Sequence, residues 1–279
     1  MKKQNIKRLD SDITEVRGLT MKFVDAHIHF SDAKYSEHTD ELAAEAKSSN
    51  VVALVSNSMD FESSVGSLKL AEKYPGTVYA ALGIHPWNVR ALKENELQQT
   101  LELISTHKQS EAVVAIGEIG LDLRYGKMYD KQLVVFKEIL SLAEKLELPI
   151  IVHSYCAATQ IVEMLPSYRI KKVLMHWFSH PMSALSKAVE NGYLITEGPP
   201  LVYSKGLREV VRRVPLTNFL TETDGPVVYK KPPFNGKMTT PSFLHEVVNA
   251  VAEIKKMDAA DVAEQVARNF QQFFNVKLS

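Results

Sequence analysis

Eight short apolar runs rich in β-branched residues recur along the 279-residue chain, separated by longer segments with helical spacing. Alternation of this kind is typical of strand–helix units that build a parallel sheet. Eight units predict an α/β fold that closes into a single (β/α)8 TIM barrel rather than an open doubly wound sheet. We expect strands at residues 23–28, 51–56, 77–82, 112–117, 149–152, 171–175, 192–196 and 218–222.

The spacing of apolar residues predicts amphipathic helices over 132–146 and 246–254. No glycine-rich dinucleotide or P-loop fingerprint follows any predicted strand. Because α/β barrels commonly run to about 250 residues, we expect residues 21–279 to form one barrel domain. The polar residues 1–20 lack the apolar core of a signal peptide and are predicted to be an extension.

The charge balance limits the partners of this chain. Lys+Arg and Asp+Glu number 33 each, which excludes a strong overall field for nucleic acid or an anionic membrane. No apolar run approaches the roughly 18 residues of a membrane helix, and Cys156 is the only cysteine. We therefore expect a cytoplasmic enzyme without a membrane partner, as a monomer or small homo-oligomer.

Polar residues gather where the predicted strands end. In the first strand, FVDAHI, alternation places Asp25, His27 and His29 on one face. The later strand ends carry His85, Glu118, His153, His176 and Asp224. The carboxyl ends of barrel strands converge on one face, so we expect residues nearly 200 positions apart to meet there.

Each of these residues alone has an ordinary structural explanation. A histidine can be a hydrogen-bonded core residue, and Glu118 or Asp224 can sit at a helix N-terminus. A shared metal site explains them together, and the mixture of imidazole and carboxylate suits Zn²⁺ or Mn²⁺, with Mg²⁺ tolerated. Six candidate ligands fit two divalent ions about 3.5–4 Å apart better than one ion. They are His27, His29, Glu118, His153, His176 and Asp224.

The motifs DAHIH, GIHPW, GEIGLD, VHS, MHWFS and TETDGP resemble, in order and spacing, those of the TatD-like metal-dependent deoxyribonucleases, a branch of the amidohydrolase-like barrels. The resemblance runs from about residue 21 to residue 274.

This resemblance implies a role for each matching residue. His27 and His29 would hold the first ion with Asp224, Glu118 would bridge, and His153 with His176 would hold the second ion. Asp25 would orient an imidazole, His85 would face the substrate, and Asp122 would be a structural loop carboxylate.

The chain departs from the family pattern around the expected pocket. Tyr155 follows His153-Ser where many relatives carry arginine, and His180 replaces a glycine in the segment usually written HCFSG. An expected Asn-x-x-Arg is here Asn269-Phe-Gln-Gln272. The expected ligands are intact while the pocket lining has changed.

The function predicted from these features is a metal-dependent deoxyribonuclease or phosphodiesterase that acts on DNA ends or single strands through water activated by two ions. Asp224, Glu118 and His85 are the predicted catalytic residues. The predicted substrate contacts are His85, Tyr155, His180, Arg124 and Tyr203. The neutral charge argues against tight binding of long duplex DNA.

Other functions remain open on the sequence alone. The same barrel and ions could cleave a carboxylic ester, lactone or amide, including an aminoacyl ester on tRNA, since a hydroxide does not itself select phosphorus. A non-catalytic metal-binding scaffold, or a barrel whose histidines only pack, would carry the same residues.

Overall fold

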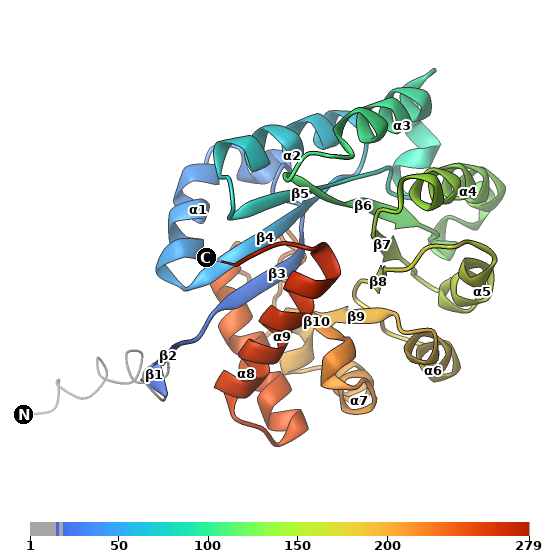
Figure 1. The fold of residues 1–279 in the computed structure, drawn as a ribbon. Helices are drawn as coiled ribbons and strands as arrows, with labels where there is room; N and C mark the ends of the chain where they lie inside the picture. Colours follow the sequence, from blue (N-terminus) through green and yellow to red (C-terminus); the bar gives the residue numbers. More distant parts are fainter. Residues whose placement is uncertain (1–14, 17–18, 279) are drawn as a thin grey trace, which may run out of the picture.

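The computed structural model describes residues 15–16 and 19–278, and within them eight parallel strands follow one another around a barrel (Figure 1). Each strand pairs with the next in the sequence. The strands are β3 (Phe23–Ile28), β4 (Val51–Asn57), β5 (Val78–Leu82), β6 (Val113–Gly120), β7 (Ile150–His153), β8 (Val173–Met175), β9 (Leu194–Glu197) and β10 (Phe219–Thr221). The predicted (β/α)8 barrel is confirmed.

Helices surround the strands on the outside (Figure 1). They are α1 (Thr39–Ser48), α2 (Phe61–Lys73), α3 (Glu96–His107), α4 (Tyr129–Leu146), α5 (Ala158–Met164), α6 (Met182–Glu190), α7 (Lys205–Arg213), α8 (Leu244–Lys255) and α9 (Ala259–Phe274). In the part of the chain that the structure describes, none of them is long and apolar enough to cross a bilayer.

The predicted extension over residues 1–20 falls mostly outside the described residues. Its two described pieces, β1 (Glu15–Val16) and β2 (Leu19–Thr20), pair as short antiparallel strands.

The strand and helix positions follow from the apolar pattern. Every residue of β3, β5 and β6 is buried, because a parallel sheet wrapped by helices is covered on both faces. On α4 the buried residues Val135, Phe136, Ile139 and Leu140 recur at helical spacing and face the barrel. The predicted helices over 132–146 and 246–254 thus correspond to α4 and α8.

Strand β6 extends three residues further than its apolar run predicts, to Gly120. Glu118 therefore lies within a strand and is fully buried, so the alternative that it starts a helix is wrong. Strand β8 begins later than predicted, at Val173, and the two preceding lysines, Lys171 and Lys172, are not buried.

The barrel closes where β10 meets β3. The Thr221 hydroxyl donates to the Val24 carbonyl at 2.7 Å, and the Asp224 amide donates to the His27 carbonyl at 2.9 Å. Beyond the strands, the His29 amide donates to the Gly225 carbonyl at 2.7 Å. This closure brings the last candidate ligand, Asp224, beside the first two.

The buried Asp25 side chain also stabilises the junction of β10 with β3. Its Oδ1 accepts the backbone N–H of His27 at 3.2 Å and that of Thr223 at 3.0 Å, and its Oδ2 accepts the Thr223 hydroxyl. Burial raises the pKa of Asp25 to about 8 against the effect of the Thr223 hydrogen bonds. The expectation that Asp25 orients an imidazole is wrong, since its partners are backbone groups and a hydroxyl.

We predict that Asp25→Ala lowers the free energy of unfolding by about 2–4 kcal/mol, because two buried N–H groups lose their acceptor. Asp25→Asn should lose much less, since its amide oxygen keeps an acceptor for both backbone N–H groups. Urea unfolding followed by circular dichroism measures both. Equal losses in the two variants would contradict this account of the junction.

Candidate metal centre

The Glu118 carboxylate lies at the centre of a cluster of imidazoles. Its Oε1 lies 2.8 Å from His153 Nδ1, 2.9 Å from His176 Nε2 and 3.1 Å from His85 Nε2. Its Oε2 lies 3.3 Å from the Nε2 atoms of both His27 and His29. One carboxylate thus divides its two oxygens between two groups of rings.

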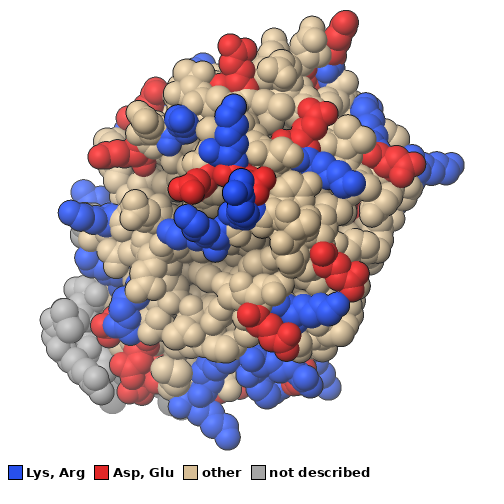
Figure 2. Space-filling view, turned by 45° about the vertical axis from the view of Figure 1, so that its right-hand side comes forward, with Lys and Arg blue, Asp and Glu red and all other residues tan. Residues whose placement is uncertain are grey.

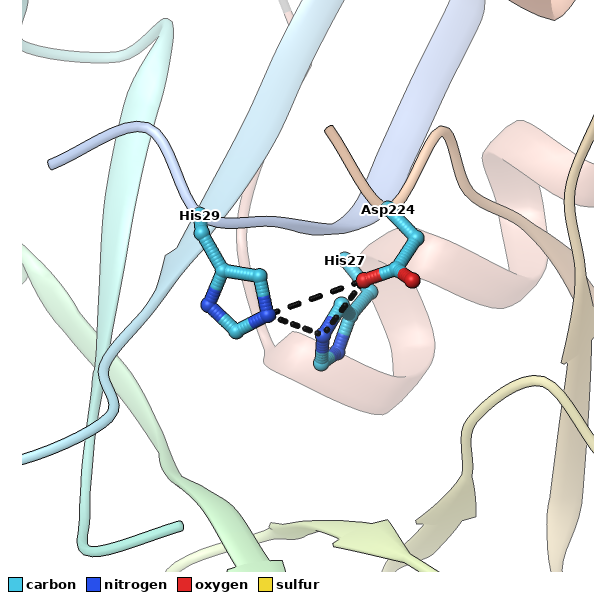
Figure 3. Close-up of side chains that lie close together, drawn as sticks. All are labelled: His27, His29 and Asp224. Carbon is cyan, nitrogen blue, oxygen red and sulfur yellow. Dashed lines mark hydrogen bonds and ion pairs between the residues drawn. The ribbon is translucent and has the colours of Figure 1, made fainter. Parts of the chain in front are cut away.

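Asp224 faces the second of these groups (Figure 3). Its Oδ1 lies 3.4 Å from His27 Nε2 and 3.6 Å from His29 Nε2, and those two nitrogens are 3.4 Å apart. Asp224 has φ of +49°, a left-handed conformation that costs a non-glycine residue free energy and is often kept at functional sites. No helix follows it directly, so it is not a helix cap.

Three sets of side chains in this cluster could each hold a cation. Within each set the ligand atoms lie within 4.8 Å of one another. The sets are His27, His29 and Asp224; His27, Glu118 and His176; and His85, Glu118 and His153. Glu118 belongs to two of them, as a bridging ligand would.

The outward nitrogen of each ring indicates where its proton lies. His29 Nδ1 lies 3.1 Å from the Asn57 carbonyl, and His176 Nδ1 lies 3.4 Å from Glu222 Oε2. Because these oxygens only accept, the Nδ1 atoms carry protons, and in the neutral rings the Nε2 lone pairs point into the cluster. Both rings therefore present a metal-binding nitrogen.

His153 and His85 differ in which ring nitrogen carries the proton. His153 Nε2 lies 3.0 Å from Asp122 Oδ2, so its Nδ1 lone pair faces Glu118. In His85, Nδ1 accepts the backbone N–H of Trp87 at 3.0 Å, so in the neutral ring Nε2 carries the proton. His85 therefore offers a hydrogen-bond donor rather than a ligand.

The charges in the cluster are those that a cation would require. Burial opposes ionisation of Glu118, but its electrostatic interactions with the His85, His176 and His27 rings outweigh burial and hold its pKa well below the usual range. Burial lowers the pKa of His85 to about 4 and holds that of His27 well below its usual value. A charged carboxylate beside neutral imidazoles is the protonation state that binds metal.

His29, His153, His176 and Asp224 behave differently. Although burial lowers the pKa values of His29 and His153, the Glu118 carboxylate beside both rings raises them above the ordinary value, together with Asp122 for His153. Although burial lowers the pKa of His176, the charges of Glu118 and Glu222 raise it well above its ordinary value. Burial raises the pKa of Asp224 to about 7, against the charges of His176 and His29. Without a metal ion the cluster therefore gathers positive charge on imidazole, in the place that a cation would take.

Two buried carboxylates next to the cluster are absent from the predicted site. Glu197 ends β9 and Glu222 follows β10, where it accepts a hydrogen bond from Thr196 Oγ1. Neither oxygen of Glu197 has a hydrogen-bond partner among the described residues, and burial together with the Glu222 charge raises its pKa well above normal. The strand-end rule that located the other ligands would have found both.

Four of the predicted substrate contacts lie outside the three candidate ligand sets. Arg124 and Tyr155 lie together at the rim, with the guanidinium carbon 3.8 Å from the Tyr155 ring centroid. Lys231 lies over the ring of Tyr203 at 5.0 Å. His180 is exposed and belongs to none of the three candidate ligand sets.

Asp122 has a larger role than that of a loop carboxylate. Besides His153, it accepts hydrogen bonds from the indole N–H of Trp87 at 2.6 Å and from Arg124 Nη2 at 2.6 Å. Burial opposes its ionisation, but these partners hold the pKa of Asp122 far below the usual range. Asp122 thus links the cluster to the rim.

Comparison with known proteins identifies the family. The family model for TatD related DNase matches residues 24–275. The chain belongs to this family. The resemblance stated from the sequence motifs is confirmed, and the protein is a metal-dependent hydrolase of the TatD family.

Its TatD relatives align over nearly their whole length. The uncharacterized metal-dependent hydrolase YabD of Bacillus subtilis is 31% identical over 90% of this chain and 98% of its own. Deoxyribonuclease TATDN3 of Homo sapiens is 29% identical, covering 93% of this chain and 97% of its own. The crystal structure of the TatD homolog YjjV from Escherichia coli superposes with a TM-score of 0.84 at 28% identity, over 91% of this chain and 98% of YjjV.

We predict that Asp122→Asn weakens zinc binding about 10- to 100-fold, because an amide places an N–H among donors and the His153 ring loses its fixed orientation. Asp130→Asn, an exposed change in the first turn of α4, is the matched control and should bind zinc like wild type. Calorimetric titration of the metal-free proteins measures the affinity. Indistinguishable affinities for the two variants would show that Asp122 does not act through His153.

Proposed function

We propose that this TatD-family protein is a deoxyribonuclease that hydrolyses phosphodiesters at DNA ends or in single strands, using two divalent ions. The division of the two Glu118 oxygens between separate groups of imidazoles carries this proposal. Two ions that share one carboxylate are common in enzymes that hydrolyse phosphoesters.

We assign the ligands accordingly. His27, His29 and Asp224 would hold one ion. His153 and His176, which both contact Glu118 Oε1, would hold the other, and Glu118 would be shared between the two ions. The inward lone pairs of the His29, His153 and His176 rings support this assignment. When bound, Zn²⁺, Mn²⁺ or Mg²⁺ would lower the pKa of water and offset charge on the attacked group.

We assign separate catalytic roles to Asp224, His85 and Glu118. Asp224 would accept the proton of the attacking water, because its carboxylate faces the His27 and His29 nitrogens with which it would hold an ion. His85, with its proton on Nε2, donates a hydrogen bond to a non-bridging oxygen of the phosphate. Glu118 stays ionised throughout, since the surrounding imidazole charges hold its pKa low.

The surface charge supports short or unpaired substrates. Formal net charge is zero, and Figure 2 shows one face on which Lys and Arg lie interspersed with Asp and Glu. Counterion release on long duplex DNA needs many aligned cations. The relative TATDN3 carries the name deoxyribonuclease, which supports DNA as the substrate. A cytoplasmic location and the oligomeric state remain predictions from the sequence.

A second candidate is hydrolysis of a carboxylic ester, lactone or amide at the same centre. Tyr155 stands where many relatives carry arginine, and Arg124 nearby is paired with Asp122, so the rim near the centre offers little free positive charge for a phosphate. Turnover of an ester panel without cleavage of labelled single-stranded DNA would favour this candidate and overturn our proposal.

We expect Asp224→Asn to reduce cleavage of a 3′- or 5′-labelled oligonucleotide by about 10²–10⁴-fold, because the water loses its proton acceptor. The exposed Asp130→Asn change should leave the rate unaltered. Single-turnover rates of the metal-loaded proteins test this. A wild-type rate in Asp224→Asn would exclude Asp224 as the base.

The metal content should be about two ions per chain in the wild type and should fall to about one in His153→Ala. The exposed His180→Ala change serves as the control and should retain two ions. Elemental analysis after gel filtration gives these numbers. Chelation should abolish activity, and added zinc or manganese should restore it. Two ions in His153→Ala would contradict the ligand assignment.

A further inference from the structure

We infer that Trp87, Arg124 and Tyr155 form a stacking shelf at the mouth of the barrel, which holds the unpaired base of the nucleotide next to the scissile bond. This inference rests on the proposed function, because it names the part of a nucleic-acid substrate that this face would bind. The three residues follow strands β5, β6 and β7.

The shelf is a continuous surface of flat groups. The guanidinium carbon of Arg124 lies 3.8 Å from the ring centroid of Tyr155 and 5.1 Å from that of Trp87. All three groups remain open to solvent, with Trp87 37% exposed, Tyr155 42% exposed and the Arg124 side chain 44% exposed. Large aromatic residues held partly in water at the mouth of a site can bind another flat group.

The buried Asp122 carboxylate fixes the orientation of the shelf. It accepts hydrogen bonds from Arg124 Nε at 3.2 Å and Nη2 at 2.6 Å, and from the Trp87 indole N–H at 2.6 Å. The guanidinium and the indole are therefore held in place before a substrate arrives. A platform ordered in this way loses little side-chain entropy when it binds a ligand.

The same hydrogen bonds argue against a phosphate clamp. The Arg124 charge is paired with Asp122 in an ion pair of 2.6 Å, so its attraction for a second anion is largely offset. One face of the guanidinium packs on the Tyr155 ring, and the Arg124 side chain still keeps 44% of its surface exposed. Guanidinium and aromatic planes attract the π-face of a base, and such stacking tolerates any base.

The shelf adjoins the candidate metal centre. Asp122 Oδ2, which anchors Trp87 and Arg124, lies 3.0 Å from His153 Nε2. The Trp87 ring centroid lies 4.7 Å from that of His85 and 6.0 Å from that of His153. A phosphate held at the candidate metal centre would thus have its own base within reach of the shelf. Only an unstacked base can lie there, which selects single strands and frayed ends.

Binding can be tested without catalysis, through the fluorescence of Trp87. The chain has two tryptophans, so Trp177→Phe leaves Trp87 as the only one. We expect dAMP to quench the emission of this metal-loaded protein with saturation, and deoxyribose 5-phosphate, which has no base, to bind at least about tenfold more weakly.

Tyr155 provides a matched pair of variants in the same background. Tyr155→Phe keeps the ring and should bind dAMP within about twofold of its parent, whereas Tyr155→Leu should lose on the order of tenfold. Binding of deoxyribose 5-phosphate should be the same in both. The inference would be wrong if Tyr155→Phe and Tyr155→Leu bound dAMP with equal affinity. It would also be wrong if dAMP and deoxyribose 5-phosphate bound with equal affinity.

A kinetic comparison separates this inference from the proposed function. An oligonucleotide with an abasic residue beside the scissile bond should show a raised KM in the wild type and no further rise in Tyr155→Leu. A KM unaffected by the missing base, in a protein that does cleave DNA, would exclude the shelf alone. If esters rather than DNA are cleaved, the proposed function fails, and the dAMP titration still decides whether the shelf binds a base.

Discussion

The candidate metal centre depends on the contact between the buried Glu118 carboxylate and the imidazoles around it. Glu118 is almost fully buried, and an isolated charge there would cost several kcal/mol. The rings on both sides of it hold its pKa low and so keep it ionised. This places a negative charge inside the barrel, where the inner ring nitrogens of His29, His153 and His176 converge. The arrangement needs a cation, and the membership in a family of metal-dependent hydrolases agrees with that requirement.

The barrel makes this contact possible by closing on itself. Asp224 lies nearly at the opposite end of the chain from His27, and hydrogen bonds across the junction of β10 and β3 bring them together. Asp25 serves this closure instead of orienting a ring, because its oxygens are occupied by backbone N–H groups and the Thr223 hydroxyl. The site and the stability of the barrel therefore share the same few residues.

Asp122 connects the chemistry of the centre to the rim. A single oxygen of this side chain lies within hydrogen-bonding distance of His153, Trp87 and Arg124. The orientation of a candidate ligand and the orientation of the stacking surface consequently depend on one group. Tyr155 in turn packs against Arg124, which comes from the neighbouring strand end.

The barrel can be predicted from the sequence, because each of eight buried parallel strands is an apolar run, and the helical period between them is visible locally. The sequence also located Glu118, Asp224 and the histidines, since strand ends of a barrel face one another by topology. The proton positions were decided by the tertiary structure, because the partner of each outer nitrogen comes from another strand or loop. The strand-end rule also applies to Glu197 and Glu222, but only the fold shows that both carboxylates are buried beside the cluster. Arg124 pairs with Asp122 and forms a flat surface with Trp87 and Tyr155. These contacts join loops that follow three different strands, so no local sequence pattern predicts them.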